Sequence, residues 1–305
     1  MLSTNREILA SAAAEKYAVG AFNICNLESL QAVVTAAKEE NSPVIVAVTP
    51  SAIEYAGLSH LAKMVEETSQ LVPTPMSLHL DHGKDLETIA KCLDAGFTSI
   101  MVDGSHLNFE ENIALARDVI GLAHPKGVAV EAELGRLAGV EEVAVEEKDA
   151  VLTDPEAAKE FVERTNVDAL AVAIGTSHGA YKFRGEPKLD FKRLTEIKGE
   201  LDVPLVLHGA SEVPAWIIEK ATRYGAQLVG ARGMPDESIK QAIRLGIAKI
   251  NIDTDLRLAF TATIREILAT SPAQFDPRKI LGPAREAMKK VAKSKMRLFG
   301  SSNKA

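Results

Sequence analysis

Short apolar, β-branched segments alternate with longer amphipathic segments along most of the chain, and this alternation limits the possible folds more than any other feature. Eight segments predict strands, at residues 17–22, 43–48, 75–80, 98–102, 127–133, 168–174, 203–208 and 247–252. The segments between them predict helices, for example residues 27–40, 59–70, 86–95, 108–123, 155–165, 188–199, 214–224 and 236–245. Strict strand–helix alternation implies a parallel sheet with right-handed crossovers.

The number of strand–helix units favours a closed barrel over an open sheet. Eight units are the number that closes a (β/α)8, or TIM, barrel. The alternative, a doubly wound open sheet, usually carries a Gly-rich fingerprint after its first strand, whereas here Asn23-Ile24-Cys25-Asn26 follows. The last residues, from 255 onward, are helical and charged. We therefore predict one α/β domain over residues 1–305, a TIM barrel with a C-terminal helical arm at about residues 271–305.

Composition excludes several classes of partner. Hydrophobic residues make up 46% of the 305 residues, enough for a large core, yet no apolar run reaches the ~20 residues of a membrane span. The net charge of −7 argues against a nucleic-acid partner. The N-terminal segment lacks the apolar block of a secretory signal, and two cysteines, Cys25 and Cys92, fit a reducing compartment. We expect a cytoplasmic protein that acts on a small molecule.

Polar residues gather where the predicted strands end. Since parallel strands of a barrel end on one rim, these residues should converge at the face where barrel active sites lie. Three of them are histidines and two are carboxylates: His82, His178, His208, Asp103 and Glu133. Three imidazoles that leave a fourth position open are typical of a catalytic zinc site. Glu131 and Lys249 lie lower on their strands, and a buried structural ion pair explains both.

Two further features favour a phosphorylated substrate and a mobile cover over it. Gly179, Gly209-Ala210-Ser211 and Asp253-Thr254 offer backbone amides and hydroxyls ahead of helices, a setting that suits phosphate. Barrels often bind phosphate in the loops after strands seven and eight. Residues 134–149, after the fifth strand, form a long acidic segment that glycines open, as in functional lids.

Five short motifs, in this order along the chain, carry a resemblance to a known family. They are His79-Leu80-Asp81-His82-Gly83, Glu131-Ala132-Glu133-Leu134-Gly135, Ile174-Gly175-Thr176-Ser177-His178-Gly179, Leu207-His208-Gly209-Ala210-Ser211 and Asn251-Ile252-Asp253-Thr254-Asp255. Together they resemble the motifs of class II, metal-dependent fructose-bisphosphate aldolases. Tagatose-bisphosphate aldolases have nearly the same set of motifs, so the sugar stays open between the two.

The resemblance implies how the work is divided in the site. It implies that His82, His178 and His208 hold a catalytic Zn²⁺, for which Co²⁺ can substitute, with Glu133 and Asp103 as alternative or second-site ligands. Asp81 would be the acid/base at the aldehyde oxygen. A glutamate of the loop after the fifth strand would take the proton from dihydroxyacetone phosphate. Glu141 matches best by spacing, with Glu142 as the alternative.

The resemblance also implies a substrate site and an assembly. The substrate-binding residues would be Asn23, Thr49, Gly179, Gly209, Ala210, Ser211, Asn251, Ile252, Asp253 and Thr254, with a monovalent cation (Na⁺ or K⁺) beside the phosphate. Arg278 matches an arginine that reaches the distal phosphate of a sugar bisphosphate from a neighbouring subunit. A homodimer or homotetramer is therefore expected.

Three other functions compete with this interpretation. A Schiff-base aldolase needs a lysine in the site, and Lys249 is the one strand lysine placed for it. A metal-dependent TIM-barrel hydrolase usually carries His-x-His at the end of its first strand, where this chain has Phe22-Asn23-Ile24. A non-catalytic metal-binding protein leaves the long acidic loop unexplained.

Overall fold

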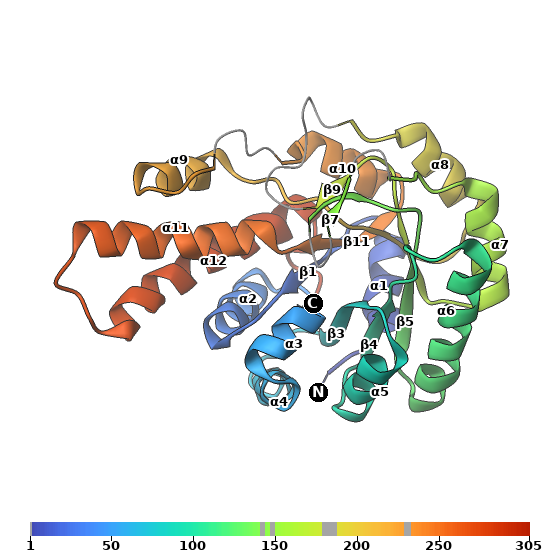
Figure 1. The fold of residues 1–305 in the computed structure, drawn as a ribbon, viewed down its shortest axis with the longest axis horizontal. Coiled ribbons are helices and arrows are strands. Elements are labelled where there is room, and N and C mark those ends of the chain that lie inside the picture. The colour runs from blue at the N-terminus through green and yellow to red at the C-terminus, as the bar shows by residue number, and fades with distance from the viewer. Residues whose placement is uncertain (1, 141–143, 147–149, 179–187, 229–232) are drawn as a thin grey trace.

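The barrel predicted from the alternation is present. A computed structural model describes residues 2–140, 144–146, 150–178, 188–228 and 233–305. Its central sheet is a closed parallel barrel with the strand order β1-β11-β10-β8-β5-β4-β3-β2 (Figure 1). The eight strands are β1 (Val19–Asn23), β2 (Val44–Val48), β3 (Met76–Gly83), β4 (Ser99–Val102), β5 (Ala129–Leu134), β8 (Ala169–Val172), β10 (Leu205–Leu207) and β11 (Ile247–Ile252).

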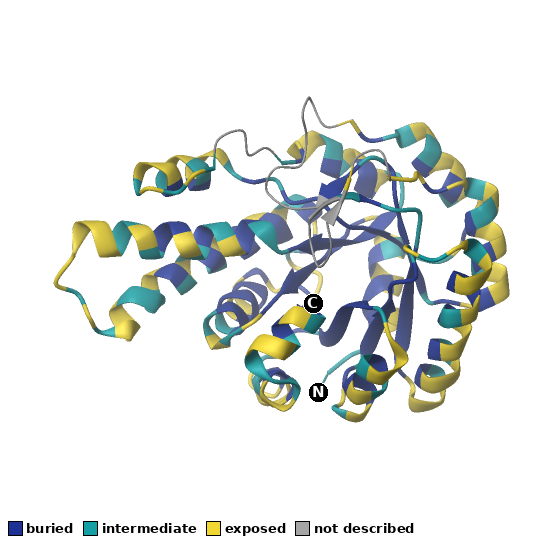
Figure 2. Cartoon of the chain, viewed as in Figure 1, coloured by how far each residue is buried: buried dark blue, intermediate teal, exposed yellow. Residues whose placement is uncertain are grey.

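Helices surround the barrel, and most of them have one buried and one exposed face (Figure 2). The helices are α1 (Asn5–Glu15), α2 (Leu27–Glu40), α3 (Pro50–Ala56), α4 (Leu58–Ser69), α5 (Leu86–Asp94), α6 (Phe109–Ala123), the 3-10 turn η1 (His124–Lys126), α7 (Pro155–Thr165), α8 (Phe191–Glu200), α9 (Ala215–Arg223), α10 (Asp236–Arg244), α11 (Thr254–Thr270) and α12 (Pro277–Phe299). Side-chain caps begin many of them: Asn26 accepts from the backbone of Ser29 at α2, and Asp154 caps α7 ahead of Pro155. No helix in the described ranges is both long and apolar enough to cross a membrane.

The barrel has an apolar bottom and a polar top. Ile8, Leu9 and Ala12 of α1 pack with barrel residues such as Ala21 and Ile45, so that α1 closes the end where the strands begin. Higher in the barrel the buried residues become polar, among them His79, Ser99, Glu131 and Lys249. The active-site rim therefore rests on a layer of buried polar and charged groups, which must satisfy one another.

The long segment after β5 has structure that periodicity did not predict. β6 (Ala138–Val140) pairs antiparallel with β7 (Ala144–Val145) and parallel with β9 (Ser177–His178). This small sheet ties the segment after β5 to the segment after β8. The short helix α3 was likewise not predicted, and it begins directly after β2 with Thr49 as its N-cap.

The C-terminal helices form the expected extension. α11 follows the last strand, and α12 turns back and packs on both α11 and α2. The far ends of α11 and α12 project from the barrel in Figure 1, where α9 lies beside α11. Arg278 lies in the first turn of α12 at this projecting end, and its side chain is 90% exposed.

Candidate active site

Asp81 of β3 is held at the barrel mouth by two side-chain amides, which come from the mutually adjacent strands β1 and β11. Asn23 Nδ2 of β1 donates to Asp81 Oδ2 (2.7 Å), and Asn251 Nδ2 of β11 donates to Asp81 Oδ1 (2.8 Å). All three side chains are buried. Because both carboxylate oxygens accept hydrogen bonds, the geometry favours an ionised Asp81. The structure thus brings together three residues predicted for the site.

A bulge in β3 brings Asp81 and His82 into the same site. Neighbouring residues of a regular strand point to opposite faces. Here the register with β4 slips between Leu80 and Gly83, and His82 has a left-handed backbone with φ +55°. Bulges at barrel rims re-aim side chains in this way. His82 is consequently buried at the mouth beside Asp81 instead of facing the outer helices.

Two imidazole nitrogens face one another across the mouth. His82 Nε2 lies 3.1 Å from His208 Nδ1, and the two rings meet edge to face. The remaining nitrogen of each ring lies against a carboxylate: His82 Nδ1 is 2.9 Å from Asp103 Oδ2, and His208 Nε2 is 3.0 Å from Glu131 Oε1. An ionised carboxylate only accepts hydrogen bonds, so these outer nitrogens carry the protons. The two nitrogens that face one another then present lone pairs.

This donor set fits a divalent metal ion. Two lone pairs at 3.1 Å repel unless a cation or a proton lies between them, and two nitrogens of a tetrahedral zinc site are about 3.3 Å apart. Carboxylates that accept from the outer nitrogens of ligand histidines are typical of metal centres. Two groups of possible ligands converge here, Asp81 with His82 and His208, and His82 with Asp103 and Glu133. The second group brings together Asp103 and Glu133, the residues predicted as alternative or second-site ligands.

The two carboxylates that contact the outer ring nitrogens, Asp103 and Glu131, both have lowered pKa values. Burial opposes ionisation of Asp103, but the hydrogen bonds with His82 and Ser105 outweigh it and hold the pKa of Asp103 below its usual range. Burial likewise opposes ionisation of Glu131, and Lys249 together with His208 keeps the pKa of Glu131 low. Burial lowers the pKa of His208, so its ring favours the neutral form that binds metal.

Lys249 and Glu131 form the ion pair that the strand positions predicted. Lys249 Nζ lies 3.0 Å from one Glu131 oxygen and 2.9 Å from the other, and both residues are buried. Lys249 is therefore engaged in a buried pair rather than offered to a substrate, which disfavours a Schiff-base aldolase.

His79, below the mouth, is bonded through Nδ1 to Ser99 Oγ (2.9 Å), and burial lowers the pKa of His79 to about 3.

The loop after β10 is held from two sides. Gly209 has φ +64°, and a Cβ at this position would lie 2.7 Å from the backbone oxygen of Ser177, so only glycine lets the two segments meet. Beyond Ser211, both oxygens of Asp255 accept backbone N–H groups, from Glu212 and Val213. The buried Lys295 of α12 pairs with Asp255 and Glu212. The loop predicted to bind phosphate is thus fixed in place before any ligand arrives.

The remaining predicted residues divide into three groups. Asn23, Thr49 and Asp253 line one cavity at the mouth, together with Cys25 and Arg257. Ala210, Ser211 and Ile252 are buried, and Thr254 begins α11. Glu141, Glu142 and Gly179 lie outside the described residues, and of His178 the structure describes only the backbone, in β9.

Two residues that support the site were missed in the sequence. Asn112 of α6 donates to the backbone oxygen of Glu133 (2.9 Å), and Ser105 donates to Asp103 Oδ1 (2.7 Å). The Asp-Gly-Ser spacing at residues 103–105 was the available signal for Ser105, since the side chain of an aspartate commonly accepts from the residue two positions onward.

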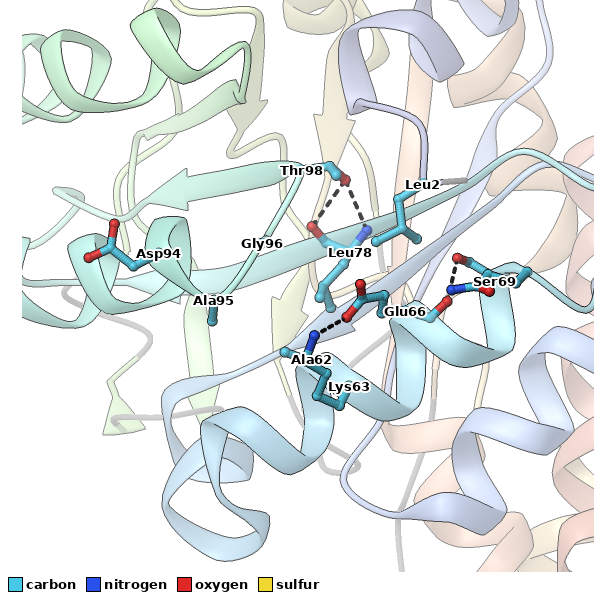
Figure 3. A pocket seen from close by; sticks show the side chains of 11 residues that line it. Leu2, Ala62, Lys63, Glu66, Ser69, Leu78, Asp94, Ala95, Gly96 and Thr98 are labelled. Carbon is cyan, nitrogen blue, oxygen red and sulfur yellow. Dashed lines mark hydrogen bonds and ion pairs between the residues drawn. The ribbon is translucent and has the colours of Figure 1, made fainter.

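A separate hollow lies beside α4 and the beginning of β4 and contains none of the predicted site residues (Figure 3). Its lining includes Leu2, Lys63, Glu66, Asp94 and Thr98.

Comparison with known sequences identifies the family. The family model described as "Fructose-bisphosphate aldolase class-II" matches residues 3–229 and 227–304. The chain belongs to the class II fructose-bisphosphate aldolase family. The resemblance seen in the motifs is thereby confirmed, and with it a family of lyases that is generally metal-dependent and acts on sugar bisphosphates.

Individual class II aldolases match along the whole chain. A fructose-bisphosphate aldolase from Thermus caldophilus is 55% identical over 306 residues, and one from Helicobacter pylori is 49% identical, each covering 100% of both chains. Among solved structures, the YdjI aldolase from Escherichia coli K12 superposes with a TM-score of 0.82 at 35% identity, covering 100% of both chains. The TIM-barrel prediction is confirmed by this likeness and by the barrel itself.

Proposed function

We propose that this chain reversibly cleaves fructose 1,6-bisphosphate into dihydroxyacetone phosphate and glyceraldehyde 3-phosphate. The observation that carries the proposal is the pair of imidazole nitrogens, 3.1 Å apart, beside a doubly hydrogen-bonded Asp81. This arrangement would provide a metal-binding donor set and a separate acid/base carboxylate in one barrel mouth, and metal-dependent aldol chemistry needs both.

His82 through Nε2 and His208 through Nδ1 would hold the metal, and His178 would be the third ligand. Nitrogen ligands suit Zn²⁺, and Co²⁺ can occupy the same kind of site. When bound, the ion supplies Lewis-acid polarisation of the ketose carbonyl. Asp103 orients His82 and, with Glu133, offers a second set of ligands around the same ring.

Asp81 would move the proton at the C4 hydroxyl. In cleavage its carboxylate takes this proton as the C3–C4 bond breaks and the aldehyde forms; in condensation it returns the proton. Its two amide partners fix the orientation of the carboxylate, so less conformational entropy is lost when the reactive geometry forms. Among the described residues, the side-chain oxygens of Asn23 and Asn251 lack a hydrogen-bond partner, and a substrate hydroxyl at the mouth would supply one.

A second carboxylate would move the proton at C3. Glu141, or Glu142 as the alternative, would protonate C3 of the three-carbon fragment after cleavage and remove that proton in the reverse direction. In the sequence it follows directly after β6 (Ala138–Val140). A base that closes over the mouth would also exclude water.

The phosphates would bind at two separated places. Gly179, Gly209, Ala210 and Ser211, with Ile252, Asp253 and Thr254 at the start of α11, would hold the phosphate of the dihydroxyacetone half, with Na⁺ or K⁺ beside it. Asn23, Thr49 and Asn251 would contact the sugar. Arg278 would bind the distal phosphate from a neighbouring subunit of a homodimer or homotetramer. The reaction would take place in the cytoplasm.

Turnover of the two epimeric sugars tests the proposal. Purified protein with Zn²⁺ should cleave fructose 1,6-bisphosphate with a kcat/KM at least about tenfold above that for tagatose 1,6-bisphosphate, a difference of about 1.4 kcal/mol. A preference for tagatose 1,6-bisphosphate would replace the substrate within the same family. Failure to cleave either sugar would overturn the proposed reaction.

A further inference from the structure

The ion pair of Glu131 and Lys249 lies directly beneath the proposed metal site, and the mechanism above gives it no task. Both side chains are at most 1% exposed, and they come from β5 and β11, which are not neighbours in the barrel order. A buried ion pair is costly to desolvate and often stabilises a fold less than apolar residues of the same size. A function for the pair is therefore worth seeking in what it touches.

Glu131 contacts the ring nitrogen of His208 that faces away from the proposed metal site. Glu131 Oε1 accepts from His208 Nε2 at 3.0 Å, while Lys249 contacts both Glu131 oxygens. Lys249 can only donate, so it holds Glu131 as a pure acceptor. The proton of a neutral His208 must then lie on Nε2, and the lone pair lies on Nδ1, the atom that faces His82 Nε2.

We propose that Glu131 and Lys249 act together as positioning residues that keep His208 in its metal-binding tautomer. Lys249 does so through Glu131, by fixing which way the hydrogen bond between Glu131 and His208 runs. The inference rests on the proposed metal site and assigns to it two residues that coordinate nothing themselves. Partners of this kind typically change metal affinity about 10- to 100-fold when they are lost.

Replacing Glu131 with glutamine separates this role from simple packing. His208 Nε2 and Lys249 Nζ both lie 3.0 Å from the same oxygen, Glu131 Oε1, so an amide oxygen at that position can accept from both. E131Q therefore removes the charge but keeps the acceptor for His208 Nε2. We expect E131Q to bind Zn²⁺ within about threefold of the wild type.

Removing the lysine should release the amide that Lys249 holds in one orientation. In E131Q/K249M either end of the amide can face His208, and an NH₂ in that place favours the proton on Nδ1, the ligand atom. This double variant should therefore bind Zn²⁺ more weakly than E131Q. E131L/K249M keeps the site apolar but offers no acceptor, and it should bind Zn²⁺ about 10- to 100-fold more weakly than E131Q.

The measurement is Zn²⁺ affinity of the metal-stripped proteins, by competition with a chromophoric chelator, with the fold checked by circular dichroism. S99A is the matched control, since Ser99 is buried in the same barrel but bonds His79, and its affinity should stay within about threefold of the wild type. E131Q/K249M binding Zn²⁺ as tightly as E131Q, or E131L/K249M binding as tightly as E131Q, would overturn the inference. A wild type that binds no divalent metal would instead overturn the proposed function.

Discussion

At the residue scale, the substitution D81N keeps the shape of the Asp81 side chain but removes its ability to accept a proton, so it tests the acid/base role alone. D81N cannot take the proton from the C4 hydroxyl, so cleavage of fructose 1,6-bisphosphate should fall about 10²- to 10⁴-fold. Exchange of the labelled C3 proton of dihydroxyacetone phosphate uses the other carboxylate and should persist. Both reactions can be followed in one preparation, by a coupled cleavage assay and by release of tritium.

Equal loss of cleavage and exchange in D81N would contradict this division of labour. The asparagine would then be disturbing its hydrogen bonds with Asn23 and Asn251, and with them the shape of the mouth. Unchanged cleavage would place the acid/base group elsewhere.

The loop glutamate makes the complementary prediction. E141Q should slow both proton exchange and cleavage, because both pass through the proton at C3. E142Q is the matched control, with the same change one position along, and should retain most of the exchange. The order of the two exchange rates decides the assignment: if E142Q is the slower, the base is Glu142.

Residue types at strand ends could be predicted from the sequence, but their directions could not. That His82, His208 and Asp103 would meet follows from closing a barrel, because strand ends share one rim. The alternation of strand faces, however, would have turned His82 away from Asp81. The bulge and the φ of +55° at His82 come from packing against β4, which no local pattern encodes.

At the element scale, Glu40 joins the end of α2 to the end of α12. Arg297 holds both Glu40 oxygens, and this hydrogen bonding, helped by Ser302 and Lys293, lowers the pKa of Glu40 to about 2 from an ordinary 4.5. A depressed carboxyl pKa stabilises the fold above the unfolded pKa, and this stabilisation disappears as the pH falls from 4.5 toward 2. E40Q should therefore lower the free energy of unfolding at pH 7 by about 1–2 kcal/mol, since Arg297 is 64% exposed and water screens the pair.

Urea unfolding of the wild type and E40Q between pH 3 and 7 checks this prediction. The difference between the two proteins should shrink as the pH falls below 4.5 and reach roughly half of its pH 7 value or less at pH 3. E39Q is the control, because the neighbouring Glu39 makes exposed pairs with Lys289 and Lys293, and it should cost less than about 0.5 kcal/mol. A difference for E40Q that does not change with pH would mean that Glu40 acts through packing rather than charge.

Elements whose apolar residues repeat at regular spacing over several turns could be predicted, and elements too short to show such a repeat could not. α2 and α7 follow the predicted ranges because their apolar faces repeat at helical spacing between clear caps. The small sheet is built from pieces of two or three residues, and β9 is defined by a partner almost 40 residues away. A strand of two or three residues is too short to show an alternating pattern, so only its pairing in the folded structure identifies it.

At the scale of the whole molecule, Arg278 is exposed on the part of the chain that projects from the barrel. It lies at the projecting end of α11 and α12 and pairs with Asp276 in the same turn. R278A should raise KM for fructose 1,6-bisphosphate about 10- to 100-fold, as expected for one charged phosphate contact. It should leave proton exchange on dihydroxyacetone phosphate nearly unchanged, because that substrate lacks the distal phosphate. K279A, one residue on, is the control and should not change KM.

Mixing variants shows whether Arg278 acts across an interface. R278A keeps the metal ligands, and H208A keeps Arg278, so a mixed dimer would rebuild one complete site. At substrate concentrations below the raised KM, a randomly mixed dimer population should recover about one quarter of the wild-type sites. Activity no higher than the sum of the two separate proteins would argue against a shared site.

The central claim, metal-dependent aldol cleavage at this barrel mouth, is tested most directly by removing the metal. The metal-stripped wild type should lose cleavage of fructose 1,6-bisphosphate and regain it when Zn²⁺ is added, whereas H82A and H208A should not regain it. Borohydride added during turnover should leave the enzyme active, because Lys249 forms no Schiff base. Full turnover by the stripped protein, together with inactivation by borohydride, would contradict the account.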